Sequence, residues 1–264
     1  MTGDGVNDGP ALKAAHIGIA MGRGTAIAKD AASLVLVDDD LSKMVSAIAM
    51  GRKIYGNLKK AIRYIISIHI PIILVVFVPL AAGWVYPNLF SPIHVIFLEL
   101  IMGPTCSIIY ENEPMEPGTM LQKPRPMSRT FFNWRELSLS IVQGLVVAGG
   151  VLAAYQLSVW QDYEENLVRT MVFSTLVIAN IFMTLANRSF EYSAIATLRY
   201  KNDLLLGILA ITAILMGTML YFGPAARLFG FESPGIGQLA ICWVLGFTSI
   251  MWLEAYKWIR RIRN

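Results

Sequence analysis

The sequence predicts a mainly α-helical membrane protein that begins with a short α/β segment. Hydrophobic residues make up 55% of its 264 residues and charged residues only 15%, which is too apolar for an ordinary soluble domain. Six apolar stretches after residue 61 approach the roughly twenty residues that a helix needs to cross a bilayer. A Gly- and Asp-rich turn and two short apolar runs precede them. We therefore expect the lipid bilayer as a partner and no nucleic acid.

The α/β segment is expected to comprise residues 1–40. The apolar runs 17–21 and 33–37 have the length of buried parallel strands, and residues 25–32 between them are expected to form a short helix. An Asp triplet that ends at Asp40 would cap the next helix. So short a segment cannot close a core of its own. We expect it to be the C-terminal part of a larger cytoplasmic domain.

The remainder is expected to be a helix at residues 41–61, which approaches the membrane as a stalk, and a transmembrane region at 62–264. The expected spans are residues 62–83, 92–110, 137–159, 168–187, 203–222 and 237–258. Twenty of the 22 Lys and Arg residues fall in the segments that would share one side of the membrane. Because positive residues collect on the cytoplasmic side, we expect a multi-pass protein with both termini in the cytoplasm.

The first turn carries a candidate metal site. Asp4, Asn7 and Asp8 supply oxygen atoms of the kind that Mg²⁺ prefers, and the glycines among them allow close approach of the backbone. An ordinary turn is the alternative, since Asp, Asn and Gly are common in turns.

Polar groups inside the first two spans predict a cation path. Pro71 frees the backbone carbonyl of Ser67, and Pro104 frees that of Leu100, so both helices are expected to be interrupted at membrane depth. Glu99 is the only acid deep in these two spans. Transporters build cation sites from such carbonyls together with a carboxylate.

We expect Glu99 to bind or relay the transported cation, and Thr105 beside the second break to belong to the same path. His69 is either a further member of this path or a neutral side chain hydrogen-bonded to a neighbouring helix. Asn180, midway along the fourth span, is likewise either a ligand or the partner in an interhelical hydrogen bond.

Residues 2–13 read TGDGVNDGPALK and closely resemble the hinge motif of P-type ATPases, the ATP-driven ion pumps. The resemblance continues through HIGIAMG at residues 16–22 and a stalk-like GRKIY at 51–55. It implies a haloacid-dehalogenase-like phosphorylation domain with ATP as the substrate of the whole pump. It further implies that Asp4 binds the Mg²⁺ ion beside a phosphorylated aspartate, and that Asn7 and Asp8 support this site.

The later part of the chain resembles the last six membrane helices of a calcium-pump-like branch with ten spans. Calcium pumps typically carry Asn, Glu, Thr or Asp side chains at their ion-binding positions. The matching positions here hold His69, Ile72, Glu99, Met102, Gly103 and Asn180. The resemblance therefore does not imply calcium. The surrounding strings are similar to a bacterial subgroup of such pumps, which implies a bacterial plasma membrane.

The reaction of this family needs an aspartate in the string D-K-T-G-T, which this chain does not contain. We expect the C-terminal portion of a cation pump, with the nucleotide-binding part and the first four membrane helices in a missing N-terminal part. Alone, the chain should not hydrolyse ATP. Two alternatives stay open: an inactive truncated membrane fragment, and a channel-like or regulatory membrane protein.

Overall fold

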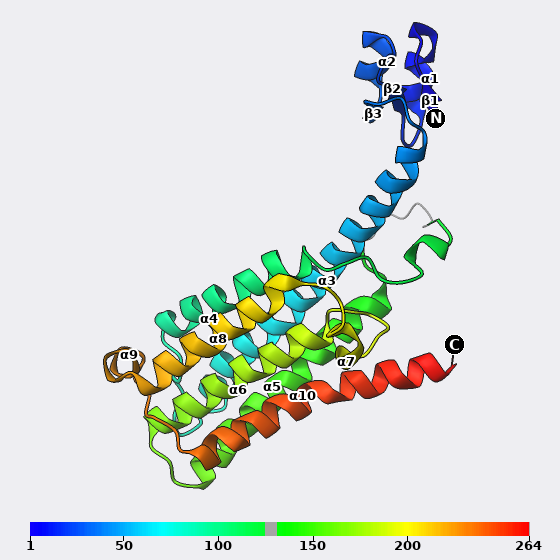
Figure 1. Ribbon diagram of the computed structural model, residues 1–264. Coiled ribbons are helices and arrows are strands. Elements are labelled where there is room, and N and C mark those ends of the chain that lie inside the picture. The colour runs from blue at the N-terminus through cyan, green and yellow to red at the C-terminus, as the bar shows by residue number, and fades with distance from the viewer. Residues whose placement is uncertain (125–130, 264) are drawn as a thin grey trace. The chain divides into compact units, whose positions relative to one another are not determined.

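The computed structural model of the protein describes residues 1–124 and 131–263 (Figure 1). Residues 125–130 and 264, which belong to the expected 62–264 membrane region, lie outside the described residues. The chain forms two units. The N-terminal unit comprises Met1–Ile54 and Pro117–Gln122, and the helical unit comprises Tyr55–Glu116 and Lys123–Asn264. Segment 117–122 joins the first unit because Arg52 donates hydrogen bonds to the carbonyl groups of Thr119 and Gln122, at 2.6 and 3.0 Å.

The N-terminal unit is a small parallel sheet in the order β1-β2-β3, with two short helices packed on it. Its elements are β1 (Thr2–Gly3), a 3-10 turn (Val6–Asp8), α1 (Gly9–Ala14), β2 (Ile19–Met21), α2 (Ala26–Ala31), β3 (Leu34–Leu36) and a 3-10 turn (Thr119–Leu121). Leu12, Ala20 and Ala28 form its core. Thr25 caps α2 by accepting a hydrogen bond from the amide of Ala28. The two predicted strands and the helix between them are therefore present.

One expectation about this unit is wrong. The run 33–37 was expected to form a buried strand, but Leu34 and Val35 of β3 are 49% and 41% exposed. The physical reason is that the small core lies around Leu12, Ala20 and Ala28, and β3 pairs on one side only, with β2. After β3, the carboxylate of Asp40 accepts hydrogen bonds from the Ser42 hydroxyl and amide, and these bonds hold its pKa below the ordinary value.

The helical unit contains the long helices, shown from cyan to red in Figure 1. The helices, including α3, which starts in the N-terminal unit, are α3 (Ser42–Ala81), α4 (Pro92–Pro104), a π-helix (Thr105–Tyr110), α5 (Trp134–Trp160), α6 (Glu165–Ala186), α7 (Ala194–Thr197), α8 (Asp203–Tyr221), α9 (Gly223–Phe229) and α10 (Ile236–Arg263). Six of the helical segments in the described part of the chain are long and apolar enough to cross a membrane. Each overlaps one of the six stretches expected from the sequence.

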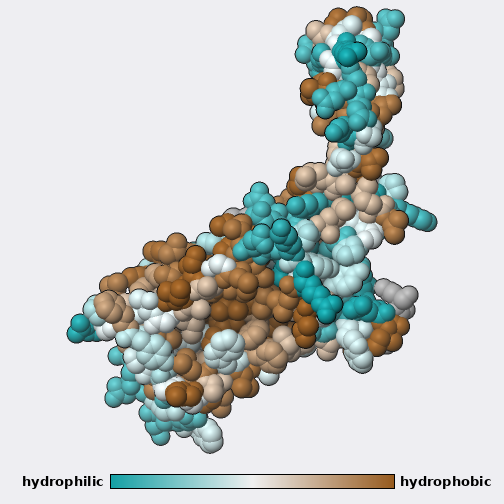
Figure 2. Space-filling model, in the orientation of Figure 1, coloured by the Kyte–Doolittle hydropathy of each residue, from teal (hydrophilic) through white to brown (hydrophobic). Residues whose placement is uncertain are grey.

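Helix α6 lies at the centre of the helical unit and packs on both α5 and α10. Glycines allow the close helix contacts. A Cβ atom at Gly246 of α10 would lie 2.8 Å from the Ile178 side chain, and one at Gly144 of α5 would lie 2.7 Å from the Ser67 carbonyl oxygen of α3. Figure 2 shows hydrophobic side chains gathered over the middle of this unit, as expected for a surface that faces lipid.

The expected helix breaks differ from the structure in one case. Helix α3 stays helical through Pro71, because a proline removes only one backbone hydrogen bond and the bonds around it hold the helix together. At Pro104 the expected change is present, since α4 ends there and the π-helix begins at Thr105.

Candidate functional site

The turn after β1 is held by the carboxylate of Asp8. Its Oδ2 atom accepts hydrogen bonds from the backbone amides of Asp4 and Gly5, at 3.0 and 2.9 Å. Gly3 has no room for a side chain, because a Cβ atom there would lie 2.6 Å from the Cβ atom of Asp8. The Asp4 carbonyl also accepts a hydrogen bond from the amide of Thr25 at 2.8 Å, which ties the turn to the start of α2. The turn is therefore a fixed structure.

The side chains of Asp4 and Asn7 are exposed at this turn and accept no side-chain hydrogen bond from the described residues. Two carboxylates and an amide are the donors that suit Mg²⁺. In the described part of the chain, however, no three His, Cys, Asp or Glu side chains converge on one point. These side chains are of the type that binds Mg²⁺, but too few of them converge here to form a complete site. This turn can contribute ligands to a metal site and cannot complete one.

In the helical unit, the structure brings His69 of α3 and Glu99 of α4 together. His69 Nε2 lies 3.1 Å from Glu99 Oε1, and the two side chains are 43% and 49% exposed. The other ring nitrogen, Nδ1, lies 2.8 Å from the Ile65 carbonyl oxygen and must donate a proton to it, because a carbonyl can only accept.

This arrangement determines how many protons the pair holds. With Nδ1 protonated, a neutral imidazole presents a bare Nε2 atom to Glu99, and two acceptors cannot form a hydrogen bond. The contact between His69 and Glu99 therefore needs one more proton, carried by either partner. A cation that binds the carboxylate would compete with this shared proton.

The pair lies on an exposed, mainly apolar face of α3 and α4. Ile65 and Ile73 flank His69 on α3, and Ile96 and Leu100 flank Glu99 on α4, and each of the four is more than 40% exposed. Leu100, whose carbonyl was expected to be freed by Pro104, is thus adjacent to Glu99. The structure places one acid and one imidazole on the same exposed face.

Ser67 lies elsewhere, buried where α3 meets α5. Its hydroxyl contacts the carbonyl oxygens of Arg63 and Ser140 at 2.8 and 3.0 Å, and its own carbonyl oxygen faces Gly144. The predicted grouping of Ser67 with Glu99 is therefore absent from the structure, since Ser67 and His69 point to different sides of α3. Because an α-helix has 3.6 residues per turn, two side chains that are two positions apart point in directions that differ by more than half a turn.

Two further residues of the expected path are bonded inside the helical unit. Asn180 Oδ1 accepts a hydrogen bond of 2.5 Å from the hydroxyl of Tyr64, which joins α6 to α3. This is the interhelical alternative stated for Asn180. Thr105 is buried and donates to the Ile101 carbonyl of its own helix at 3.4 Å. Neither contacts the His69–Glu99 pair in the described structure.

A buried ion pair at one end of the helical unit was not predicted from the sequence. Arg188 Nε donates to Glu113 Oε1 at 2.7 Å, and both side chains are fully buried. Asn202 donates to the same carboxylate oxygen at 2.8 Å, and Asn57 donates to the Glu113 carbonyl at 2.7 Å. Burial also raises the pKa of the nearby Tyr200 hydroxyl. The only signal was the position of Arg188 directly after an apolar run.

The sequence model of the family described as "Cation transporting ATPase, C-terminus" matches residues 87–259. A calcium-transporting ATPase of Listeria monocytogenes is 30% identical over 258 residues, which are 97% of this chain and 29% of that protein. Calcium-transporting ATPase 1 of Lactococcus lactis is 38% identical over 189 residues, covering 72% of this chain and 21% of its own. The calcium-transporting ATPase of Bacillus subtilis is 34% identical over 233 residues, which are 87% of this chain and 26% of that protein. The chain thus spans less than a third of the length of these relatives.

Proposed function

Because this chain belongs to the cation-transporting ATPase family, we propose that it is the C-terminal, membrane-spanning portion of an ATP-driven cation pump. The observation that carries the proposal is the His69–Glu99 pair. It is an acid held by a proton-sharing partner, on an exposed face of two helices that are long and apolar enough to cross a membrane. Ionisable side chains at such places are rare and costly unless they serve transport.

In this proposal Glu99 binds the transported cation with its carboxylate. The cation displaces the shared proton, and His69 then remains as a neutral imidazole that still donates from Nδ1 to Ile65. The exposed face around the pair leaves Glu99 accessible from outside the described helices. The backbone carbonyl of Leu100, one turn before Pro104, is the proposed second oxygen ligand.

The names of the relatives indicate calcium as their cation. We propose an inorganic cation for this chain and treat calcium as the first ion to test. His69, Gly103 and Asn180 stand where calcium pumps of the family typically carry carboxylates or amides, and in this structure Asn180 is bonded to Tyr64. A site with a single carboxylate holds less negative charge, which favours fewer or smaller charges on the bound ion.

The turn at residues 2–13 is proposed to supply part of the Mg²⁺ site at which the whole pump is phosphorylated by ATP. Mg²⁺ offsets negative charge on the transferring phosphoryl group. Asp4, with its free and exposed carboxylate, is the proposed ligand. Asp8 holds the turn through the amides of Asp4 and Gly5, and its second oxygen remains for a supporting role with Asn7.

The chain is an integral, multi-pass membrane protein by its family and its six long apolar helices. We propose that both termini lie in the cytoplasm, since 20 of 22 Lys and Arg residues fall on that side under the positive-inside rule. A bacterial plasma membrane is proposed because several relatives are bacterial. The proposed parts are a phosphorylation-domain segment (1–40), a stalk (41–61) and a transmembrane region (62–264).

The test is ATP hydrolysis by the pump that contains this chain, reconstituted in vesicles and screened with Ca²⁺, Mn²⁺, Mg²⁺, Na⁺ and K⁺. We expect one of these ions to stimulate hydrolysis, and Glu99→Gln to abolish the stimulation because the neutral amide cannot replace a carboxylate ligand. Glu232→Gln changes an exposed acid outside the spans and is the matched control. Full stimulation of the Glu99→Gln pump would remove Glu99 from the cation path.

The alternatives of an inactive fragment and of a channel-like protein need a separate test. The isolated chain should form no phosphoenzyme with radiolabelled ATP, because it contains no D-K-T-G-T string. The reading frame upstream of Met1 then discriminates. A D-K-T-G-T segment in frame supports the pump, whereas a stop codon between that segment and Met1 supports the inactive fragment. Cation flux without ATP through vesicles that contain the chain would favour a channel.

A further inference from the structure

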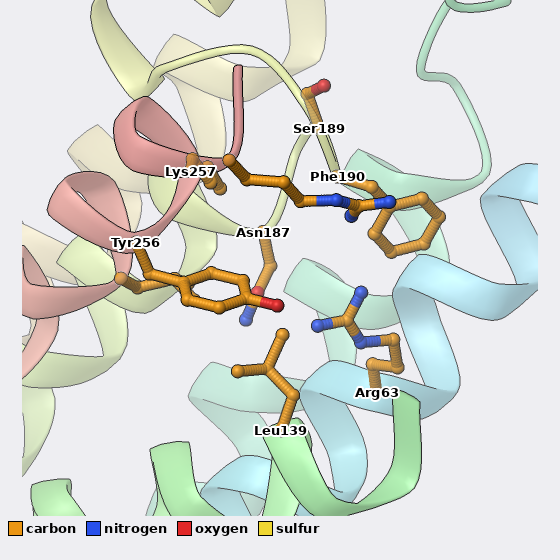
Figure 3. Close-up of a pocket in the computed structure, with 9 residues that line it drawn as sticks. Arg63, Leu139, Asn187, Ser189, Phe190, Tyr256 and Lys257 are labelled. Atoms are coloured by element: carbon orange, nitrogen blue, oxygen red, sulfur yellow. The ribbon is translucent and has the colours of Figure 1, made fainter. Parts of the chain in front are cut away.

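A positively charged pocket lies at one end of the helical unit, where α3, α5, α10 and the segment after α6 meet. Figure 3 shows Arg63, Leu139, Tyr256 and Lys257 arranged around it, with Phe190 across from Arg63. An inner hollow of about 20 Å³ adjoins an outer one of about 150 Å³, and both are lined by Phe190, Lys257 and Arg260. A water molecule needs roughly 10–15 Å³ by this measure, so the outer hollow can hold a much larger group.

Arg63 is the unusual member of this pocket. Its side chain is buried, yet no described residue places a carboxylate within ion-pair distance of it. Its partners are the hydroxyl of Ser140, 3.3 Å from Nε, and the ring of Phe190, whose centre lies 4.7 Å from the guanidinium carbon. The acid on the neighbouring helix, Glu136, is bound to Lys59 at 2.7 Å. Glu136 attracts Arg63 without forming a direct ion pair with it, and a buried charge that lacks a directly bonded opposite charge is costly.

The other charges of the pocket leave a positive excess. Lys257 is buried and is neutralised by Glu254, at 2.9 Å, while it also donates to the Ala186 carbonyl. Arg260 is exposed and forms no ion pair with the described residues, and Arg261 rests on the ring of Tyr192. Glu191 is the one acid that lines the outer hollow. Among the residues that line the two hollows, four are cations (Arg63, Lys257, Arg260 and Arg261) and one is an acid (Glu191).

The position of the pocket along the helices suits a membrane headgroup. Arg63 directly precedes the buried apolar residues of α3, and Lys257 and Arg260 lie in the last turns of α10, where its apolar part ends. Basic pockets between membrane helices at this level bind the headgroups of anionic lipids. The Tyr256 hydroxyl accepts a hydrogen bond from Arg135 at 3.1 Å, so its own proton is free to point into the pocket.

We propose that the outer hollow binds a phosphate group, with the guanidinium group of Arg260 as its ligand and the buried charge of Arg63, which lines the adjoining inner hollow, adding to the attraction, and that an anionic phospholipid supplies the phosphate. Guanidinium groups match phosphate oxygens in geometry and form charge-assisted hydrogen bonds with them. The proposal rests on the pocket alone and is independent of the pump function proposed above, because no residue of the cation path or of the first turn lines it.

The test is native mass spectrometry of the full chain in detergent, titrated with phosphatidylglycerol, phosphatidylcholine or inorganic phosphate. Both lipids carry a phosphate group, but the choline cation of phosphatidylcholine is repelled by the positive excess of the pocket, so we expect phosphatidylglycerol to bind at least about tenfold more tightly. Arg63→Gln and Arg260→Gln should each remove most of this preference. Arg227→Gln, an exposed cation outside the pocket, should keep it.

The outcomes separate the possibilities. Equal binding of both lipids by the unmodified chain overturns the proposal, and so does an undiminished preference in the Arg260→Gln chain. Because Arg260 is exposed, its substitution cannot act by unfolding the protein, which keeps the test decisive if Arg63→Gln fails to fold. Binding of inorganic phosphate that depends on both arginines, with no lipid preference, would support the phosphate site and overturn the lipid as its source.

Discussion

Two contacts in the helical unit, each between an acidic and a basic side chain, have similar geometry and opposite surroundings. His69 and Glu99 lie 3.1 Å apart with nearly half of each side chain exposed, whereas Arg188 and Glu113 lie 2.7 Å apart with none exposed. The second pair has further hydrogen bonds, from Asn57 to the backbone carbonyl of Glu113 and from Asn202 to its carboxylate. We call this buried pair the closed pair and the exposed His69–Glu99 pair the open pair. A closed pair holds the fold and cannot exchange its partner. An open pair can release its proton or accept a cation, so the open pair is the candidate for transport.

Hydropathy along the chain does not report this difference. Glu99 lies in a long apolar stretch, whereas Glu113 and Arg188 lie between the expected spans. The difference arises because a membrane helix buries only the side that faces its neighbours. Polar connecting segments, by contrast, fold over the helix ends and bury their charges there. Exposure in this unit follows the packing of the helices, which hydropathy along the chain does not report.

Removal of one member of the closed pair should have the largest effect on stability. Arg188→Leu leaves the Glu113 carboxylate buried without its cation, which typically costs about 3–5 kcal/mol of the free energy of unfolding. Thermal unfolding of the detergent-solubilised chain, followed by circular dichroism, measures this loss. Arg199→Leu removes an exposed arginine from the same connecting segment and should change the unfolding temperature little.

A double substitution sharpens the same point. Replacing both charges, as in Glu113→Gln with Arg188→Leu, removes the unpaired buried carboxylate, and much of the lost stability should return. If the double variant is no more stable than Arg188→Leu, the cost lies in lost packing of the arginine side chain. The closed pair would then not be the reason for the stability of this end of the unit.

The buried side of α3 provides the next prediction. Gly144→Ala places a Cβ atom 2.7 Å from the Ser67 carbonyl oxygen and 2.8 Å from the Ile70 Cβ atom, so α3 and α5 must move apart. Overpacking of this kind typically costs about 1–3 kcal/mol.

The control is on the same helix. Gly149→Ala meets no atom within 4 Å, so it should leave stability unchanged or raise it by up to about 1 kcal/mol through the better helix propensity of alanine. Both substitutions are compared by the same unfolding measurement. Equal unfolding temperatures for the two variants would show that α3 and α5 are not in close contact at Gly144.

The fold was largely predictable from the sequence, because the length and hydropathy of membrane helices are local properties. All six predicted spans overlap long helices, and the family that residues 2–13 resemble is the one to which the comparisons assign the chain. The exposure of β3 and the continuity of α3 through Pro71 were not predictable, since both depend on neighbouring elements. Whether a strand is covered or a helix bends at proline is a tertiary property.

Two of the residues predicted for the cation path lie close together in the structure and a third does not, while their role in transport stays a prediction. Glu99 and His69 were singled out by their rarity inside apolar stretches, and the structure brings them within 3.1 Å of each other. Ser67, two residues before His69, points to the opposite side of α3 and is buried against α5. The unpaired Arg63 gave no signal in the sequence, where it was one of many cations near the ends of spans.

The smallest effect on stability is expected at the open pair. Glu99→Gln removes the carboxylate without leaving an unpaired charge, because His69 can stay neutral and keep its hydrogen bond to Ile65. Half-exposed ion pairs contribute little, so the free energy of unfolding should change by less than about 1 kcal/mol. The same unfolding measurement tests this, with Arg188→Leu as the reference for a large loss. Cation stimulation of the pump, in contrast, should be lost in this variant. A loss of stability at Glu99→Gln comparable to that at Arg188→Leu would show that Glu99 holds the fold, and the contrast between an open and a closed pair would then no longer support a transport role.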